Sequence, residues 1–316
     1  MKKVIITAFT AFVLFSCQND STESSDSNVS AIAQRGCATQ EVFEAQLKAD
    51  PTLAIRMNEI EAFTSKSILT NRLVNGKIEI PVVVNVLYRT AAENISDAQI
   101  QSQIDVLNKD FNALNSDYNS VPALFSGVKA NVGITFVLDQ IIRKSTTKTS
   151  WGTNDAVKKV AQGGLAPTSP TTKLNLWACT IGGGILGYAQ FPGGAAATDG
   201  VVIDSKYLGL AGSGSAPYNL GRTATHEVGH WMNLRHIWGD ANCGSDLVSD
   251  TPTHNTANYG VPAYPHYSTC TGTPVEMTMN YMDYVDDNAM YMFSQGQKTR
   301  ISAIFVTGGP RAAFGI

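Results

Sequence analysis

Charged residues are scarce in this 316-residue chain: they make up 16% of the sequence, and the formal net charge is only −3. This balance offers no basic face, so we expect no nucleic-acid partner. The sequence also has no internal repeat. Low charge, together with abundant glycine, serine, threonine and asparagine, favours an exported protein. The hydrophobic share of 43% suffices for one large domain or two smaller ones with a real core.

The apolar run at the N-terminus is too short to span a bilayer as a mature helix. Two lysines precede it, and it comprises about twelve residues, Val4 to Phe15. It ends at Ser16-Cys17 and resembles a bacterial lipoprotein signal, in which cleavage precedes a cysteine that receives lipid. We therefore expect residues 1–16 to be a lipoprotein-type signal peptide and Cys17 to be the membrane anchor. The alternative is a plain secretory signal with an incidental cysteine; both export the protein and permit disulfides.

Histidine is also rare, but three of the five histidines lie within eleven residues, HEVGHWMNLRH. On a helix, His226 and His230 lie one turn apart on the same face and can hold one Zn²⁺. Glu227 then lies beside the metal as a general base. A continuing helix would carry His236 away, so the chain must turn at Asn233, a residue type that tolerates left-handed backbone. Three neutral histidines with an open fourth position describe a catalytic zinc site.

Two segments separate the signal from this motif's domain. Residues 17–30 are polar, serine-rich and acidic, which predicts a disordered tether. From residue 31 to about 75, apolar residues recur at helical intervals and are interrupted at Asp50-Pro51, which predicts two short helices. This stretch carries Cys37, whose thiolate can occupy the fourth zinc position and keep the site latent. A buried or disulfide-bonded Cys37 is the alternative.

The pattern of the remaining chain predicts a mixed α+β or α/β class. Runs rich in valine and isoleucine predict strands, and capping boxes predict helices that open at Ser96 and Ser294. The three glycines at 182–184 form no phosphate-binding loop, because no Lys-Ser/Thr pair follows them. The predicted strands are Ile78–Tyr88, Gly133–Ile142, Leu174–Cys179 and Val201–Ile203.

The stretch between His236 and Ser294 has little periodicity over more than fifty residues, and a loop-rich region of this length needs covalent staples. Cys243 and Cys270 flank its middle and are the natural disulfide pair. The bond would constrain a loop of about 27 residues and contribute roughly 3 kcal/mol on the chain-entropy model. Cys179 is left over, and its place on an apolar strand predicts a buried free thiol.

A methionine downstream of the histidines, Met282 in NYMDY, resembles the Met-turn of metzincins. Three stretches, HEVGHWMNLRHIWGD, CGSDLVSDTP and MNYMDYVDD, together resemble the pappalysin family of metzincin metallopeptidases, in particular its bacterial ulilysin-like members. The resemblance covers about residues 76–316, which we therefore expect to be the catalytic domain, with residues 31–75 as its propeptide. One departure is Asn233, where the general metzincin motif has glycine.

The resemblance implies a fold and a set of roles. The fold is a metzincin-type catalytic domain: a twisted, mostly parallel sheet and helices above the cleft, and a loop-rich lower subdomain with a C-terminal helix. Structural calcium is known in relatives, and Asp246 and Asp250 supply suitable oxygens, although solvated loop acids are an equally good interpretation. The implied roles are zinc ligands for His226, His230 and His236, a Met-turn at Met282, a transition-state contact from Tyr284, a Cys243–Cys270 disulfide, and a cysteine switch at Cys37.

These observations predict a secreted or surface zinc endopeptidase with protein or peptide substrates, and we expect a monomer. Glu227 takes a proton from the attacking water and delivers it to the leaving amine, while zinc and Tyr284 stabilise the oxyanion. An extended substrate could add to a sheet edge running from Leu174–Cys179 to Phe191. Relatives favour a basic residue just after the scissile bond, but the only acids between the two paired cysteines are Asp246 and Asp250.

Two rival functions fit parts of the sequence. One is a zinc peptidase of another architecture, in which a distant acid replaces His236 as the third ligand. The other is a non-enzymatic surface lipoprotein or binding module with a structural metal site, against which Glu227 argues, because a structural site has no use for a base. Since Cys17 precedes the propeptide, removing the propeptide would also release the catalytic domain from its anchor.

Overall fold

The computed structural model describes residues 34–69, 78–210, 212, 214 and 216–314. The predicted signal peptide, Cys17, the tether and the predicted propeptide boundary near residue 75 lie outside the described residues. Among the residues described, no helix combines the length and the apolar character that crossing a membrane requires.

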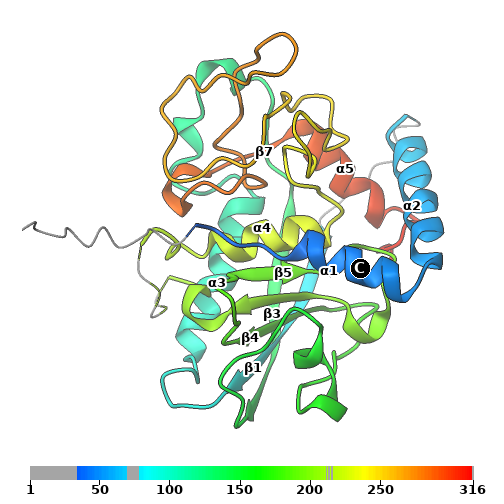
Figure 1. Ribbon diagram of the computed structural model, residues 1–316, viewed down its shortest axis with the longest axis vertical. Coiled ribbons are helices and arrows are strands. Elements are labelled where there is room, and N and C mark those ends of the chain that lie inside the picture. Colours follow the sequence, from blue (N-terminus) through cyan, green and yellow to red (C-terminus); the bar gives the residue numbers. More distant parts are fainter. Residues whose placement is uncertain (1–33, 70–77, 211, 213, 215, 315–316) are drawn as a thin grey trace, which may run out of the picture. The chain divides into compact units, whose positions relative to one another are not determined.

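A five-stranded sheet forms the centre of the described chain (Figure 1). Its first four strands are parallel, and β5 at one edge runs antiparallel to its neighbour β6. Valine and isoleucine are frequent in β1, and leucine, tryptophan, alanine and cysteine fill most of β4, because these central strands are largely buried on both faces. The predicted mostly parallel sheet is confirmed. In sheet order the strands are β3 (Ile134–Ser145), β1 (Ile78–Tyr88), β4 (Leu174–Cys179), β6 (Val201–Asp204) and β5 (Gly187–Ala189).

Two helices cover one face of this sheet. Helix α3 (Asp97–Phe111) begins at Ser96, whose side chain accepts a hydrogen bond from the backbone of Gln99, as the sequence predicted. Its apolar stripe packs with α4 (Arg222–Trp231) and with one set of alternating strand residues in the main core. The other face carries a second apolar cluster, which includes Trp177 and Tyr188 and is covered by α1 and the long β3–β4 connection.

The two helices predicted between residues 31 and 75 are present as α1 (Thr39–Ala49) and α2 (Thr52–Leu69). Asp50 separates them and accepts a hydrogen bond from the backbone of Thr52, so one residue ends the first helix and caps the second. Helix α1 lies along the edge strand β5, and α2 lies beside the C-terminal helix α5 (Gln295–Phe305) (Figure 1). Both helices therefore pack on the domain that carries the histidine motif.

The loop-rich region after α4 is held by cross-links and buried polar groups. The predicted Cys243–Cys270 disulfide is present, and Cys179 is a buried free thiol. Buried His254 accepts a hydrogen bond from the backbone of Met277 at 3.0 Å. The capping box predicted at Ser294 and Gln297 opens α5. A short ribbon pairs β2 (Lys129–Ala130) with β7 (Phe293–Ser294), and 3₁₀ turns lie at Tyr118–Ser120, Ala123–Phe125, Ala156–Lys158, Val160–Gln162, Ala196–Thr198, Ser205–Tyr207 and Asp287–Ala289.

Candidate metal centre

The three motif histidines point their Nε2 atoms at a common centre. His226 and His230 lie one turn apart on α4, with their Nε2 atoms 3.1 Å apart, and the Nε2 atom of His236 lies 3.0 Å from that of His230. All three side chains are buried. The Sγ atom of Cys37 joins them, and the four potential ligand atoms lie within 4.8 Å of one another. This is the arrangement that a single metal ion requires.

The other ring nitrogen of each histidine, Nδ1, forms a hydrogen bond with an oxygen acceptor. The Nδ1 atoms of His226 and His230 lie 2.7 Å from the carbonyl of Tyr281 and 2.8 Å from that of Leu234, and Nδ1 of His236 contacts the Asp240 carboxylate. An acceptor at Nδ1 places the proton there and leaves the Nε2 lone pair for a metal. Burial and then the neighbouring histidines lower the pKa of His226 well below its usual value and that of His230 to about 3. These two rings are therefore neutral.

The turn between the second and third histidines has the predicted backbone. Asn233 has a φ of +74°, in the left-handed region, and its N–H donates to the carbonyl of His230 at 2.9 Å. Arg300 donates to the Asn233 carbonyl at 2.7 Å, which fixes the turn from the side of α5. The prediction that asparagine ends the helix here is confirmed, and the turn returns His236 to the other two imidazoles.

Glu227 is buried beside the histidines and is covered by the N-terminal segment. Its Oε2 atom accepts a hydrogen bond from Thr39 Oγ1 at 2.8 Å and from Cys37 Sγ at 3.4 Å. Burial raises the pKa of Glu227 to about 7, and burial followed by the charge of Glu227 raises the pKa of the Cys37 thiol. Gly187 makes room for the carboxylate, because a Cβ atom there would lie 2.9 Å from Glu227 Cγ.

Met282 and Tyr284 both lie close to the histidine cluster. A Cβ atom on Gly229 of α4 would lie only 2.5 Å from Met282 Sδ, so the sulfur packs directly on the helix that carries the histidines. The Tyr284 ring contacts His236 with a centroid distance of 4.9 Å, and its hydroxyl donates to the Cys37 carbonyl at 3.1 Å. Burial raises the Tyr284 pKa, so the hydroxyl keeps its proton.

The sheet edge beside this centre is β5, not β4 as the sequence analysis suggested. Strand β4 lies between β1 and β6, because its continuous apolar run is buried on both faces. At the true edge, Cys37 forms a parallel bridge with Gly187, and Ala38 donates to the Gly187 carbonyl at 3.1 Å. The chain's own N-terminal segment thus occupies the position where a peptide could add to the sheet.

Arg35, two positions before Cys37, binds a buried acid, Asp287, that the sequence did not reveal as part of the site. The guanidinium of Arg35 donates to Asp287 Oδ1, to Val285 O at 3.2 Å and to Thr223 Oγ1 at 3.3 Å. Both members of the ion pair are buried. Asp287 lies within the stretch MNYMDYVDD, outside the segment between Cys243 and Cys270 that holds Asp246 and Asp250. Its place just after the Met-turn was the available signal.

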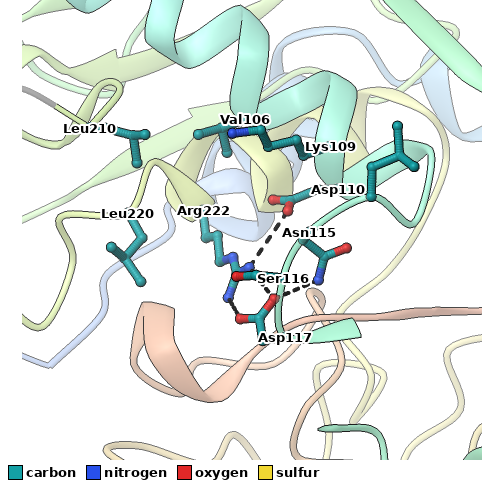
Figure 2. Close-up of a pocket in the computed structure, with 10 residues that line it drawn as sticks. Val106, Lys109, Asp110, Asn115, Ser116, Asp117, Leu210, Leu220 and Arg222 are labelled. Carbon is teal, nitrogen blue, oxygen red and sulfur yellow. Dashed lines mark hydrogen bonds and ion pairs between the residues drawn. The ribbon is translucent and has the colours of Figure 1, made fainter. Parts of the chain in front are cut away.

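A separate pocket, drawn in Figure 2, lies at the start of α4. It has a volume of about 270 Å³ and lies against the first residue of α4, Arg222. Arg222 donates to both oxygens of Asp117, at 2.6 and 2.8 Å, and lies 3.7 Å from Asp110, whose pKa burial raises to about 6. The charged groups here neutralise one another and brace the start of α4, so this pocket is not the catalytic centre.

The two acids considered for calcium belong to different hydrogen-bonding groups. Asp246 is bonded to Thr251 Oγ1 and to the backbone of Val248, and burial raises its pKa to about 6. Asp250 instead accepts from Ser294 Oγ at 2.6 Å and from Gly296 N at 2.8 Å, at the start of α5. Within the described residues, the group able to hold a metal is the one at Cys37 and the three histidines. The calcium site stays a prediction.

The mixed fold and this buried group define a metallopeptidase. The family model described as pregnancy-associated plasma protein-A matches residues 178–305. Extracellular metalloprotease 1 of Coccidioides posadasii is 34% identical over 73% of this chain and 78% of its own length. An extracellular metalloprotease of Pyricularia oryzae is 32% identical over 88% of this chain and 92% of its own length.

Two solved structures from Tannerella forsythia are also similar. A promirolysin mutant is 39% identical with a TM-score of 0.81 and covers 89% of this chain and 97% of its own. Mature mirolysin in complex with a cleaved peptide is 43% identical with a TM-score of 0.74, covering 77% and 97%. The chain belongs to the pappalysin family of metzincin metallopeptidases and is a metalloendopeptidase. The non-enzymatic alternative is therefore set aside.

Proposed function

We propose that the described chain is the latent form of a secreted zinc endopeptidase, whose propeptide lies within residues 31–75 and whose catalytic domain spans residues 76–316. The observation that carries this proposal is the meeting of three histidine Nε2 atoms and Cys37 Sγ within 4.8 Å, directly beside Glu227. Four buried nitrogen and sulfur donors suit zinc, the ion with which such donor sets are associated in hydrolases.

His226, His230 and His236 would hold the ion. When bound, zinc supplies Lewis-acid chemistry: it lowers the pKa of a water molecule and polarises the peptide carbonyl. The acceptors at the three Nδ1 atoms orient the imidazoles for this task. Met282 supports the site from below, because its sulfur packs against α4 at Gly229.

Glu227 and Tyr284 carry the proton and charge chemistry of the protein itself. Glu227 takes a proton from the attacking water and passes it to the amide nitrogen as the peptide bond breaks, a contribution of typically 10²–10⁴ in rate. The Tyr284 hydroxyl, which donates to the Cys37 carbonyl in the latent form, donates to the substrate's carbonyl oxygen as charge develops there. The buried surroundings strengthen this hydrogen bond by excluding water.

Latency follows from the same contacts. Cys37 would supply a fourth ligand atom and thereby exclude the water, while Thr39 holds Glu227 and the segment at Gly36–Ala38 fills the edge of β5. The promirolysin structure matches 89% of this chain and mature mirolysin 77%. The additional 12% (89% less 77%) is about the length of residues 34–69, which supports a propeptide made of α1 and α2.

The buried carboxylate of Asp287 supports a preference for a basic residue just after the scissile bond. Arg35 occupies this Asp287 site in the latent form with three hydrogen bonds, two residues from the thiol at the centre. Once the propeptide leaves, the buried carboxylate is available to an arginine or lysine side chain of a substrate. Asp287, rather than Asp246 or Asp250, is therefore the proposed specificity acid.

The sequence and the relatives both support export, whereas membrane anchoring rests on the sequence alone. The curated relatives are named extracellular metalloproteases, which supports secretion of this chain. Lipid on Cys17 stays a prediction. With that anchor ahead of the propeptide, activation would also release the catalytic domain from the membrane, and active full-length enzyme still bound to lipid would contradict this link.

The experiment that tests the proposed function compares the zinc-loaded wild-type protein with Glu227→Ala. Mass spectrometry before and after incubation gives metal content and processing site, and casein cleavage gives activity. We expect one zinc per chain in both proteins, with cleavage reduced at least about a hundredfold in the variant. Near-wild-type turnover by Glu227→Ala would show that Glu227 is not the general base. Retention of zinc by the double variant Cys37→Ala/His236→Ala would instead favour the rival architecture with a distant third ligand.

A further inference from the structure

A second polar contact of the N-terminal segment lies on the other side of Cys37 from Arg35. Helix α1 places the side-chain amide of Gln46 against two acceptors at once: Asp155 Oδ2 at 3.3 Å and Gln190 Oε1 at 3.2 Å. Asp155 and Gln190 are 6% and 1% exposed, so this pair forms a buried acceptor site beneath the helix. Neither residue has a part in the chemistry proposed above.

The acceptor pair is held in place by the catalytic domain alone. Gln190 donates to the Ala195 carbonyl at 2.9 Å and accepts from Thr198 Oγ1 at 2.7 Å. The other oxygen of Asp155 pairs with the buried ammonium of Lys158 at 2.9 Å. All these contacts remain when α1 leaves, so the two acceptor atoms stay aimed at one position.

The position of the pair suits a peptide lying on the sheet edge. Gln190 directly follows β5, whose N–H at Ala189 is bonded to Thr39 Oγ1 in the latent form. Successive strand residues face opposite sides, so Gln190 shares the face of Tyr188, which is the face that α1 covers (Figure 1). An extended peptide on β5 presents every second side chain to this face.

We propose that Asp155 and Gln190 form a substrate subsite for a primary amide side chain, that of glutamine, on the N-terminal side of the scissile bond. The inference rests on the proposed function, because the proposed role of Asp287 places the C-terminal side of the scissile bond at the other end of the site. Lys158 already balances the charge of Asp155, so a second cation gains little there. A carboxylate offers no donor to either oxygen, so both acceptors would face it without a hydrogen bond. An amide donates to both acceptors, as Gln46 does.

The test uses mature, zinc-loaded enzyme obtained by activation of the full chain. Peptides with one scissile bond followed by arginine carry glutamine, methionine, lysine or glutamate at each of the four preceding positions in turn. At one position at least, we expect kcat/KM for glutamine to exceed that for methionine about threefold to tenfold, the value of one or two neutral hydrogen bonds. The kcat/KM for the peptide with glutamate at the same position should be lower than that for the peptide with methionine.

A variant at Asp155 then tests whether the preference for glutamine arises from Asp155 and Gln190. Asp155→Asn replaces a carboxylate, which only accepts, with an amide that can also donate to a carboxylate, so the glutamine-to-glutamate ratio should fall severalfold. Asp139→Asn, a matched change in the Lys173 ion pair on β3, should leave that ratio unchanged. Equal cleavage of all four side chains at every position by the wild-type enzyme overturns the subsite and leaves the proposed function standing. If no peptide is cleaved at all, the proposed function fails, and this inference fails with it.

Discussion

The hydroxyl of Thr39 donates a 2.8 Å hydrogen bond to the carboxylate of Glu227. The same Thr39 oxygen, Oγ1, accepts a hydrogen bond from the backbone N–H of Ala189. Thr39 therefore ties the proposed general base to the sheet edge, two residues beyond the thiol at the metal centre. Latency in this chain has two parts: Cys37 at the ligand position, and Thr39 on the base and on the strand to which substrate would add.

We expect Thr39→Val in the full-length chain to weaken latency. Valine has nearly the same shape but leaves Glu227 and Ala189 without this partner, and a hydrogen bond to a charged group contributes about 1.5–3 kcal/mol. Spontaneous activation, followed as cleavage of a fluorogenic peptide over time, should therefore be roughly tenfold faster.

Two further variants serve as controls for the effect of Thr39→Val on the rate of activation. Thr39→Ser keeps the hydroxyl and should behave as the wild type, whereas Cys37→Ala removes the proposed fourth ligand and should speed activation more than Thr39→Val does. If Thr39→Val activates at the wild-type rate, the hydrogen bond to Glu227 has no part in latency. Activity per mature enzyme should be equal in all of them, because both positions lie in the proposed propeptide.

A second prediction concerns the packing of the Met-turn on α4. Gly229→Ala would place a Cβ atom 2.5 Å from Met282 Sδ, and Met282 is fully buried, so its side chain must shift within the packed core. Overpacking of this kind typically costs about 1–3 kcal/mol, more than alanine gains in helix propensity. We expect a lower midpoint of thermal unfolding. Gly127→Ala is the control, since a Cβ atom there meets nothing within 4 Å; a Gly229→Ala protein as stable as this control would refute the packing.

Features of the fold and site could be predicted from the sequence where residues close together in the chain determine them. The strand Ile78–Tyr88 and the turn at Asn233 were predictable, because burial on both faces selects apolar residues and a left-handed turn selects asparagine. The three-residue edge strand Gly187–Ala189 is too short to show a period, so the edge was assigned to β4 instead.

Contacts between distant residues were the part that sequence could not supply. Thr39 and Glu227 are 188 positions apart, and Arg35 and Asp287 are 252 apart. Neither pair belongs to a repeating pattern, and one acid among many gives no sign of its partner. The three histidines were found because their helical spacing is itself the signal, and His236 could be added because the turn at Asn233 is short.

A third prediction concerns Tyr284. Tyr284→Phe removes only the hydroxyl that would donate to the developing oxyanion, and the ring contact with His236 can remain. We expect kcat to fall about tenfold to a hundredfold with KM little changed, because the lost hydrogen bond strengthens in the transition state. Zinc content should equal that of the wild type. A variant that changes KM alone would show that the hydroxyl binds substrate without stabilising the transition state.

The last prediction separates the two roles of Asp287, which binds Arg35 in the latent form and, by proposal, the basic substrate side chain in the mature form. Asp287→Asn keeps an acceptor for the backbone N–H of Leu220 but removes the charge. In the mature enzyme, kcat/KM for peptides with arginine after the scissile bond should fall at least tenfold relative to peptides with leucine there. Breaking a buried ion pair costs about 3–5 kcal/mol, so the latent form should also activate faster.

Arg35→Gln supplies the comparison that makes this prediction specific. It breaks the same ion pair from the other side, so the full-length chain should also activate faster than the wild type. Arg35 leaves with the propeptide, however, so the mature enzyme from Arg35→Gln should keep the wild-type preference for arginine. If Asp287→Asn and Arg35→Gln give mature enzymes with the same preference, Asp287 serves latency alone, and the acid that selects basic substrates lies elsewhere in the cleft.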